Sequence, residues 1–482
     1  MTNKKNIILI LSDQQRYDTV SAYGLNDICK TPHIDALANE GMKFTNAFTS
    51  SPICAPARAS VMTGLYPHNH GVIDNFTDIK DGIPVLGKCM NEQGYYCGLA
   101  GKWHVSATKT PEDCGFEGKP FMGYGFPGSQ VFPSLIFNQP PDNLPNYYEE
   151  YLKENNFNIP DVSNGFLGNN PALQIQEMYA KHEGPVESTI EYFVAHEANR
   201  LIDDAIRQDK PFLIWANFWG PHSPSIVPEP YYSMYDPKDI KEHPSYKDDF
   251  KDKPYGYYLT EKMWGLGDYG WDGFADISAK YYGHCTMIDD MVGLIVDKLK
   301  KLGIYDDTII IYGADHGDCL GAHKLIEKGA FTFDEIYRIP MIVKGLGDKD
   351  NDSFVYLQEI MPTLLEIAGT KPPKAVDGES LLPLMNGTKE SNNRTEIFGE
   401  FHNHFYVSRQ RMVRDNKYQF TFNENEKGEL YDFTNDPYQL NNFCYNERYK
   451  DIKSEYMEKL SHHLKASNDP ASIWFHRIKE FY

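Results

Sequence analysis

The chain has 482 residues, of which 41% are hydrophobic and 24% charged, and its formal net charge at pH 7 is −21. This length predicts one large and one smaller domain, and the composition is that of a soluble globular protein. The negative charge argues against nucleic acid or an anionic membrane as a partner, and no stretch approaches the roughly 20 apolar residues of a membrane span.

Short buried strands alternate with helices along the first three quarters of the chain. The predicted strands are 6–11, 42–48, 95–100, 212–216, 308–312 and 340–343, and the predicted helices are 31–38, 86–93, 188–207, 277–302 and 357–368. This alternation predicts an α/β fold with a large, mainly parallel sheet sandwiched by helices. In such a sheet a ligand binds at the carboxyl ends of the strands.

Two segments interrupt this alternation, and a different pattern follows it. Residues 119–180 and 225–272 are rich in aromatic residues and Pro, and we expect both to be long insertions over the mouth of the site rather than core. Residues 374–482 are predicted to form a smaller α+β subdomain, with strands at 396–400, 405–409, 410–414 and 417–422 and a helix at about 450–466. Residues 1–373, including both insertions, would then form the larger domain.

Acidic and imidazole groups follow two of the predicted strands. Asp13 follows strand 6–11, and Asp315 and His316 follow strand 308–312. A carboxylate and an imidazole that converge with a second carboxylate can hold a divalent cation. For a single Asp a turn or a helix cap is the ordinary interpretation, so it is the convergence that favours a metal site.

The most specific motif is the run Ser51-Pro-Ile-Cys-Ala-Pro-Ala-Arg-Ala-Ser60, followed by Thr63-Gly64. Pro56 suits the first turn of a helix. Cys54 would therefore lie at a helix N-terminus, where free N–H groups favour an anionic ester. A lone cysteine is usually a small buried hydrophobic residue, but this run resembles the signature of the sulfatases. In that family the cysteine is oxidised after translation to formylglycine.

Further motifs extend the resemblance from about Asn6 to Gly369. Gly101-Lys102-Trp103-His104 and Pro221-His222-Ser-Pro224 are similar to sulfatase elements, and so is the run from Gly321 to Gly329. The resemblance implies an alkaline-phosphatase-like fold. It also implies catalytic roles for six residues: Cys54, Arg58, Lys102, His104, His222 and Lys328.

The resemblance further implies one bound divalent cation, touched by the modified Cys54, Asp13, Asp315 and His316. Many sulfatases have a second aspartate after the first, whereas this chain has Gln14, which could offer an amide oxygen or no ligand at all. Calcium suits an oxygen-rich site, while the nitrogen ligand leans towards manganese or zinc. We expect Ca²⁺, with Mn²⁺ and Zn²⁺ as alternatives.

A sulfate monoester resists attack because its negative oxygens repel a nucleophile, so several cations are needed around it. The resemblance implies that hydrated formylglycine is the nucleophile and that His222 protonates the leaving alcohol. The implied partners are a small sulfated substrate and a sulfatase-maturing enzyme that acts on Cys54. We favour a sulfated mono- or oligosaccharide attacked from its end.

Several alternatives stay open. Phosphonate monoester and phosphodiester hydrolases of the same superfamily share the Asp-Gln and Asp-His pairs as well as the cysteine motif. The segment from Thr31 to Asn75 also resembles choline sulfatases. A protein of a different class, a non-catalytic binder of sulfated ligands, would result if Cys54 were not modified. The oligomeric state, including a homo-oligomer, is not indicated.

Substrate contacts are the least specific part of the prediction. Five aromatic residues could stack against a sugar or simply pack within loops: Trp219, Tyr231, Tyr232, Trp264 and Trp271. The candidate substrate-binding residues are His323, Asn75, Trp103, His402, His404, Arg409 and Arg411. The histidines and arginines after residue 400 could recognise a carboxylate, such as that of a uronic acid.

The N-terminus and the cysteines indicate a cytoplasmic protein. After Lys4 and Lys5 the apolar run spans only residues 7–11, and a secretory signal needs roughly 7–15 apolar residues. The eight cysteines show no disulfide-framework spacing. Cys114, Cys285 and Cys319 are therefore expected to be free thiols in a reducing compartment.

Overall fold

A large sheet forms the centre of the structure, a computed structural model that describes residues 4–121, 147–158, 161–168, 176–265, 269–404 and 407–479. The sheet has eight strands in the order β11-β2-β10-β9-β1-β7-β3-β4. Their bounds are β1 (Asn6–Asp13), β2 (Gly41–Phe48), β3 (Tyr96–Lys102), β4 (Pro120–Phe121), β7 (Phe212–Pro221), β9 (Thr308–Ala314), β10 (Met341–Lys344) and β11 (Asn351–Tyr356). Strands β3, β7, β1 and β9 are parallel neighbours. The predicted α/β fold with a mainly parallel sheet is confirmed.

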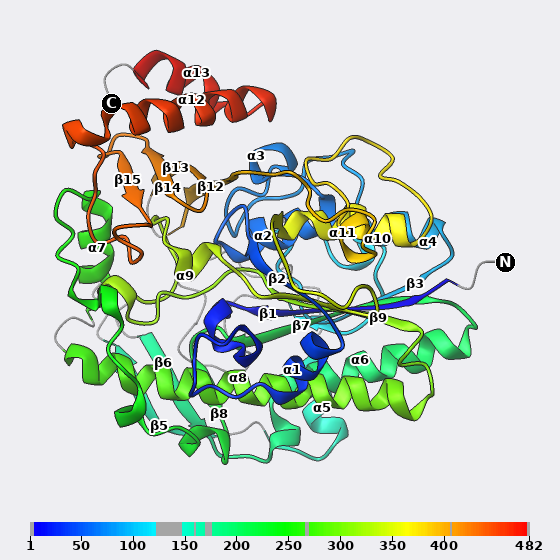
Figure 1. Ribbon diagram of the computed structural model, residues 1–482. Coiled ribbons are helices and arrows are strands. Elements are labelled where there is room, and N and C mark those ends of the chain that lie inside the picture. The colour runs from blue at the N-terminus through cyan, green and yellow to red at the C-terminus, as the bar shows by residue number, and fades with distance from the viewer. Residues whose placement is uncertain are drawn as a thin grey trace.

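Helices cover both faces of this sheet (Figure 1). One face carries α1 (Pro32–Asn39), α5 (Tyr147–Glu154), α6 (Ile190–Arg207) and α8 (Gly270–Lys301), and the other carries α2 (Cys54–Thr63), α4 (Leu86–Glu92), α10 (Ile360–Ile367) and α11 (Leu382–Met385). Strand β1 sends Ile8 and Ile10 into one core and Ile7, Leu9 and Leu11 into the other. Because both faces are buried, this strand is a continuous apolar run.

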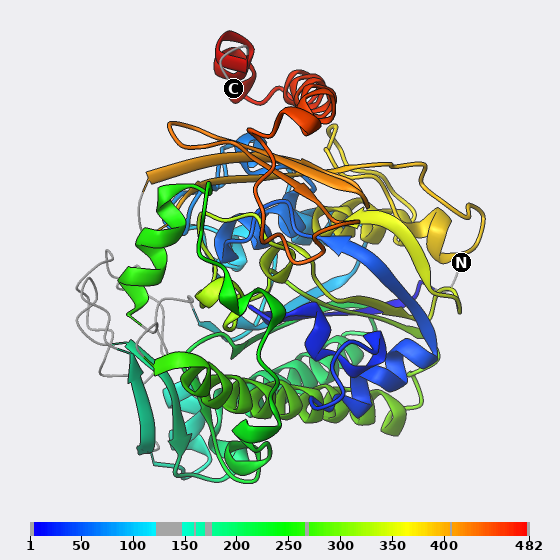
Figure 2. The same ribbon diagram turned by 60° about the vertical axis from the view of Figure 1, so that its left-hand side comes forward.

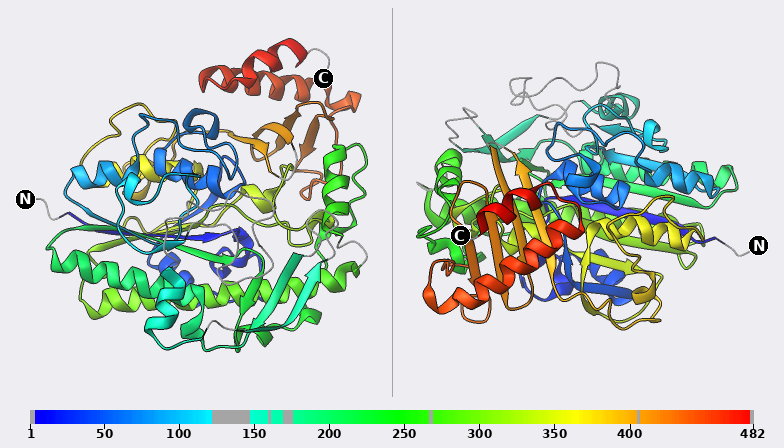
Figure 3. Two further views of the ribbon diagram at one scale, coloured as in Figure 1. Left: turned by 180° about the vertical axis from the view of Figure 1, so that it is seen from behind. Right: turned by 90° about the horizontal axis from the view of Figure 1, so that it is seen from above.

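A second, antiparallel sheet contains β12 (Ile397–Asn403), β13 (Val407–Arg414), β14 (Tyr418–Asn423) and β15 (Glu429–Asp432), in that order. Helices α12 (Lys450–Ala466) and α13 (Ala471–Ile478) lie across its outer face (Figures 2 and 3). Separate strands at 405–409 and 410–414 were a wrong prediction, since residues 407–414 form one strand and 405–406 lie outside the described residues. The domain boundary at residue 373 stays a prediction.

The two segments expected over the site mouth contribute to the core in their described parts. Helix α5, from the first segment, buries Tyr148 and Leu152 against α6, and α7 (Tyr255–Trp264), from the second, buries Tyr257 and Trp264. A third sheet joins the segments through β5 (Val162–Gly168), β6 (Gln176–His182) and β8 (Ser225–Val227). In these described parts the aromatic residues are packing groups, and the position of the two segments over the site mouth stays a prediction. Residues 122–146, 159–160, 169–175 and 266–268 lie outside the described residues.

Strand β10 differs in direction from most of the central sheet, because it runs antiparallel to both of its neighbours, β9 and β2. The short helices α3 (Pro67–His70) and α9 (Asp334–Tyr337) complete the helices of the described residues. All eight cysteines are buried free thiols. Among the described residues, no helix combines the length and apolar character needed to cross a membrane.

Candidate functional site

Four neighbouring strands of the central sheet end at the candidate site. Strand β1 ends with Asp13 and β3 with Lys102, while Asp315 comes directly after β9. His222 follows Pro221, the last residue of β7. Because these strands are parallel, their carboxyl ends meet at one edge of the sheet. The topology of the sheet thus brings together residues that lie far apart in the sequence.

Cys54 is the first residue of α2 and is 1% exposed. Its Sγ lies 3.2 Å from Nε2 of His316 and 3.7 Å from Oδ1 of Asp13. Burial alone would raise the pKa of this thiol, but the positive charges of Lys102, Lys328 and His316 hold the pKa well below its ordinary value. The site therefore stabilises negative charge at the position of the Cys54 side chain.

Arg58 lies one turn further along α2 and connects the two carboxylates of the site. Its Nε donates to Oδ2 of Asp315 at 2.9 Å, and its Nη2 donates to Oδ2 of Asp13 at 3.0 Å. Nζ of Lys102 also contacts Oδ2 of Asp13, at 2.6 Å. All of these side chains are buried, so each charge depends on its partners.

Four side chains of the site could hold a divalent cation. Ligand atoms of Asp13, Cys54, Asp315 and His316 all lie within 4.8 Å of one another. Nδ1 of His316 donates to the carbonyl oxygen of Gly317 at 2.9 Å, so Nε2 faces the cluster. Two carboxylates, the imidazole of His316 once a cation displaces its Nε2 proton, and the side chain of residue 54 form a donor set that fits such a cation.

Gln14 lies beside this donor set, but its amide has other contacts. Its Oε1 accepts from Nζ of Lys328 at 2.5 Å, and its Nε2 donates to Oδ2 of Asp318 at 2.6 Å. Its backbone N–H donates to Oδ1 of Asp315 at 3.0 Å. In this structure Gln14 therefore orients Lys328 and Asp315.

His104 lies on the other side of Cys54. Its ring hydrogen-bonds with Cys54, and its side chain is buried. Burial, together with the charge of Lys102, lowers the pKa of His104 to about 4. The imidazole is therefore neutral at pH 7 and able to accept a proton.

His222 and Lys328 meet at the opposite side of the site from the Arg58 pairs. Nε2 of His222 lies 2.7 Å from Nζ of Lys328, and Nδ1 donates to the carbonyl oxygen of Ser223 at 2.6 Å. Since an ammonium group only donates, Nε2 of His222 accepts in this contact. The ring of Trp219 lies 5.0 Å from His222, and Nζ of Lys102 lies 4.7 Å from the same ring.

Two of the candidate substrate residues lie near these groups. Oδ1 of Asn75 accepts from the backbone N–H of Ala55 at 3.1 Å, so Asn75 contacts the first turn of α2. Burial and the charge of Lys328 lower the pKa of His404 to about 3, and the charge of Cys54 acts in the opposite direction. His404 is therefore within electrostatic reach of Cys54 and Lys328.

Three other candidates lie in different surroundings. Trp103 is completely buried in the core on the α2 side of the sheet, so its assignment as a substrate contact is corrected. His323 is buried, with Nδ1 at 2.6 Å from Oδ2 of Asp248 and its ring stacked on Phe333. Arg409 is an exposed residue whose nearest ionic partner is Glu424 at 3.4 Å.

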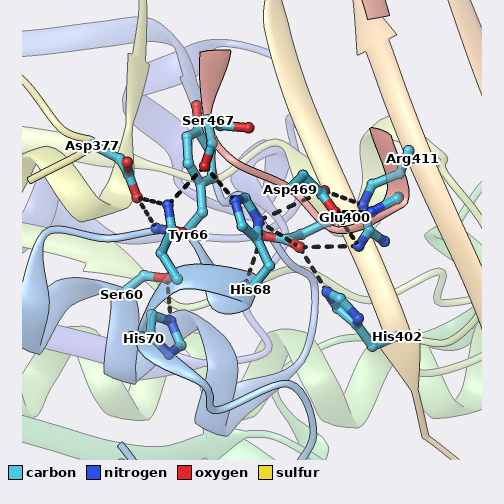
Figure 4. Close-up of polar contacts among 12 residues, drawn as sticks. Ser60, Tyr66, His68, His70, Asp377, Glu400, His402, Arg411, Ser467 and Asp469 are labelled. Atoms are coloured by element: carbon cyan, nitrogen blue, oxygen red, sulfur yellow. Dashed lines mark hydrogen bonds and ion pairs between the residues drawn. The ribbon is translucent and has the colours of Figure 1, made fainter. Parts of the chain in front are cut away.

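His402 and Arg411 belong to a separate buried cluster, which also contains His68, Glu400 and Asp469 (Figure 4). Nε2 of His402 lies 2.6 Å from Oε2 of Glu400. The guanidinium of Arg411 donates to both oxygens of Asp469, at 2.5 and 3.1 Å. These two side chains therefore form ion pairs within the protein and are not available to bind a carboxylate group of a substrate. Their assignment as substrate contacts is corrected.

Sequence reasoning missed Glu327 and Asp318, and it left open whether Trp219 stacks against a sugar or packs within a loop. Glu327 directly precedes Lys328 in the motif, and its Oε2 accepts from Nζ of that lysine at 2.9 Å. The adjacent Glu327 and Lys328 in the motif would have indicated a carboxylate beside the lysine ammonium group. Trp219 is 3% exposed and packs between site residues. Among the other aromatic candidates, loop packing describes Tyr231, Trp264 and Trp271, which contact hydrophobic clusters.

Comparisons with known proteins agree with this geometry. The profile of the family described as "Sulfatase" matches residues 5–370, and that of the C-terminal region of N-sulphoglucosamine sulphohydrolase matches residues 321–466. The chain is 28% identical to an uncharacterized sulfatase, YidJ, of Escherichia coli, over 97% of this chain and 88% of the relative. It is 25% identical to an N-acetylglucosamine-6-O-sulfatase of Bacteroides thetaiotaomicron, over 97% of this chain and 88% of the relative.

A solved structure shows the same fold. The phosphonate monoester hydrolase of Agrobacterium radiobacter superposes with a TM-score of 0.80 and 25% identity, covering 96% of each chain. The family profile spans more than half of the chain, from β1 to the end of α10. The chain therefore belongs to the sulfatase family of sulfuric ester hydrolases, within the alkaline phosphatase superfamily.

Proposed function

We propose that the protein hydrolyses a sulfate monoester by means of a formylglycine made from Cys54 by a maturing enzyme. One observation carries this proposal. Sγ of Cys54 lies at the meeting point of two neighbouring lysines, an imidazole and the metal donor set. Such a position suits a nucleophile that must attack an anionic ester.

Asp13, Asp315, His316 and residue 54 would hold one divalent cation, for which we propose Ca²⁺. A bound cation would supply positive charge beside the sulfate oxygens and the nucleophile. Arg58 donates to Oδ2 of each carboxylate, while Oδ1 of Asp13 lies near Sγ of Cys54. Burial by itself would raise the pKa of Asp13, but the charges of Lys102 and Arg58 hold it below its ordinary value. That carboxylate is therefore ionised and available as a ligand.

The remaining cations and imidazoles would bind the ester and move protons. The charges of Lys102 and Lys328 both act on the Cys54 side chain, and these two lysines would contact the sulfate oxygens. His222 would protonate the departing alcohol, and its Nε2 faces the site beside Lys328. His104 is neutral and hydrogen-bonded to residue 54, so it would accept a proton from the nucleophilic residue.

The substrate we propose is a small sulfated saccharide attacked at its end. The N-acetylglucosamine-6-O-sulfatase relative supports this class of substrate. The overall charge of −21 also disfavours a long polysulfated chain. Asn75 and His404, the two candidates near the reacting groups, would contact the substrate. We further propose that the protein acts in the cytoplasm on short fragments.

A second candidate function is hydrolysis of a phosphonate monoester. The Asp13-Gln14 pair and the Asp315-His316 pair favour it, as does the similarity to the phosphonate monoester hydrolase of Agrobacterium radiobacter. A phosphonate monoester carries a single negative charge, as a sulfate ester does. The same cations would therefore serve both substrates.

The decisive experiment compares two esters with one leaving group. The protein is co-expressed with a maturing enzyme, formylglycine at position 54 is verified by mass, and hydrolysis of 4-nitrophenyl sulfate is measured beside 4-nitrophenyl phenylphosphonate. Faster turnover of the sulfate, lost in Cys54→Ala, supports the sulfatase proposal. Faster turnover of the phosphonate supports the second candidate. No turnover of either ester by verified protein contradicts an aryl ester activity and directs the search to a panel of sulfated saccharides.

A further inference from the structure

A buried carboxylate stands among the cations of the site without a role in the proposed reaction. Glu327 is 2% exposed and precedes Lys328 directly. Burial by itself would raise the pKa of Glu327, but the charge of Lys328 lowers it, so this side chain is ionised. A negative charge this close to the position of an anionic ester opposes substrate binding. Glu327 therefore needs a function that compensates for this cost.

Both carboxylate oxygens of Glu327 have partners on the two loops that carry His222 and Lys328. Oε2 accepts from Nζ of Lys328 at 2.9 Å. Oε1 accepts from the hydroxyl of Ser223, the residue after His222. Glu327 thus joins the loop that follows β7 to the loop that follows β9.

The backbone fixes the direction in which Glu327 points. Its φ is +63°, in the left-handed region that a residue with a Cβ rarely adopts. Its N–H donates to Oδ1 of Asp318 at 2.8 Å, and its carbonyl oxygen accepts from the N–H of Cys319 at 2.9 Å. An uncommon backbone conformation persists where surrounding contacts hold it. These contacts place the carboxylate against Lys328.

Lys328 in turn donates to Oε1 of Gln14 at 2.5 Å and to Nε2 of His222 at 2.7 Å. Without Glu327, the ammonium group of Lys328 would lose the carboxylate that holds it beside Nε2 of His222. We propose that Glu327 is a positioning residue that holds Lys328 and, through Ser223, the His222 loop, so that Nε2 of His222, protonated in the substrate complex where Lys328 contacts the sulfate, is directed at the leaving oxygen. This inference rests on the proposed function, in which His222 is the leaving-group acid.

The test is the dependence of the rate on the leaving group. A good leaving group such as 4-nitrophenolate needs little proton transfer, whereas phenolate needs much more. In the matured, metal-loaded enzyme, Glu327→Gln should lower kcat/KM for phenyl sulfate about 100-fold and for 4-nitrophenyl sulfate less than about tenfold. Ser223→Ala should shift the ratio of the two rates in the same direction by a smaller factor.

A matched control comes from another buried carboxylate paired with a cation. Glu359 accepts from Arg394 at 2.6 and 3.1 Å, and Glu359→Gln should change the rates for both leaving groups by the same factor. Equal losses in Glu327→Gln, or no loss, would overturn the positioning role. Thermal unfolding of each variant identifies a general loss of structure.

The outcome is separable from that of the proposed function. Wild-type turnover of the sulfate pair tests the sulfatase proposal by itself, and phenyl and 4-nitrophenyl phenylphosphonate allow the same comparison of leaving groups if phosphonates are preferred. Nitrogen NMR of the histidines needs no turnover at all. It should show Nδ1–H of His222 hydrogen-bonded to the carbonyl oxygen of Ser223 in the wild type and a weaker hydrogen bond in Glu327→Gln, and an unchanged His222 spectrum would contradict the proposal.

Discussion

Two buried clusters of acids, imidazoles and arginine differ in how their polar atoms are used. The Cys54 cluster contains Asp13, Cys54, Asp315 and His316 with Arg58, and the His68 cluster contains His68, Glu400 and Asp469 with Arg411. Nδ1 of His68 lies 2.9 Å from Oε1 of Glu400, and Nε2 contacts the carbonyl oxygen of Ser467 at 3.0 Å. In the Cys54 cluster, by contrast, Nε2 of His316 faces a thiol sulfur.

The difference lies in what each cluster leaves available. In the His68 cluster both imidazole nitrogens already have partners, and Arg411 neutralises the carboxylates (Figure 4). That cluster joins the segment after α2 to β12 and to the turn before α13, so it holds the second sheet against the central body. Ligand atoms converge in both clusters, so convergence of buried charge does not identify a catalytic centre unless an imidazole nitrogen remains available as a ligand.

The largest expected change in the free energy of unfolding follows replacement of the arginine in either cluster. Arg58→Met and Arg411→Met each leave buried carboxylates without their partner, which should cost about 3–5 kcal/mol of the free energy of unfolding. Urea denaturation measures this loss. Only Arg58→Met should also abolish turnover by the folded fraction. Equal losses of turnover in both variants would break the distinction between the clusters.

A smaller change in the free energy of unfolding is expected as the pH rises. Burial alone would lower the pKa of His68, but Glu400 and then Asp469 raise it to about 9 from 6.5. A raised folded-state pKa contributes stability that is fully present below about pH 6.5 and is lost as the pH rises through about 9. The contribution is about 3 kcal/mol. Urea denaturation across this range should show the decline in the wild type, and His68→Gln should flatten it.

Metal removal should act on the Cys54 cluster alone. A ligand at 100 times its Kd stabilises the folded state by about 2.7 kcal/mol. Calcium should therefore raise the Tm of the chelator-treated protein and restore its turnover. The rise should disappear in Asp315→Asn and persist in Glu400→Gln, and the opposite pattern would assign the cation to the His68 cluster.

The smallest expected effect is at Arg409, which is 57% exposed in its side chain and pairs with Glu424 at 3.4 Å. An exposed ion pair contributes about 0–1 kcal/mol. Arg409→Ala should therefore change the free energy of unfolding by less than about 1 kcal/mol. A larger loss, or a change in KM for a uronic acid substrate alone, would return Arg409 to the substrate contacts.

The sequence predicts the central sheet and the convergence of its strand ends well, because these follow from local patterns. The apolar run of β1 indicates a strand buried on both faces, and Pro56 correctly indicates the first turn of α2. Asp13 and Asp315 are brought together by parallel pairing, which the alternation of strands and helices implies.

Other features depend on partners that are distant in the sequence. Strand β10 is antiparallel although its sequence resembles that of its neighbours, because strand direction depends on the path of the chain. Trp103 lies between two site residues but points into the core, since successive side chains at a strand end alternate. Arg411 pairs with Asp469, a residue 58 positions away that no local pattern connects to it.

The burial of α2 determines when Cys54 can be modified relative to folding of the chain. All ten residues of this helix are buried, and Cys54 is 1% exposed at its start. An enzyme that oxidises this thiol needs access to it, which the folded chain does not give. The proposed maturation must therefore precede folding. The yield of active protein then depends on how fast Cys54 is modified relative to the folding of the newly synthesised chain.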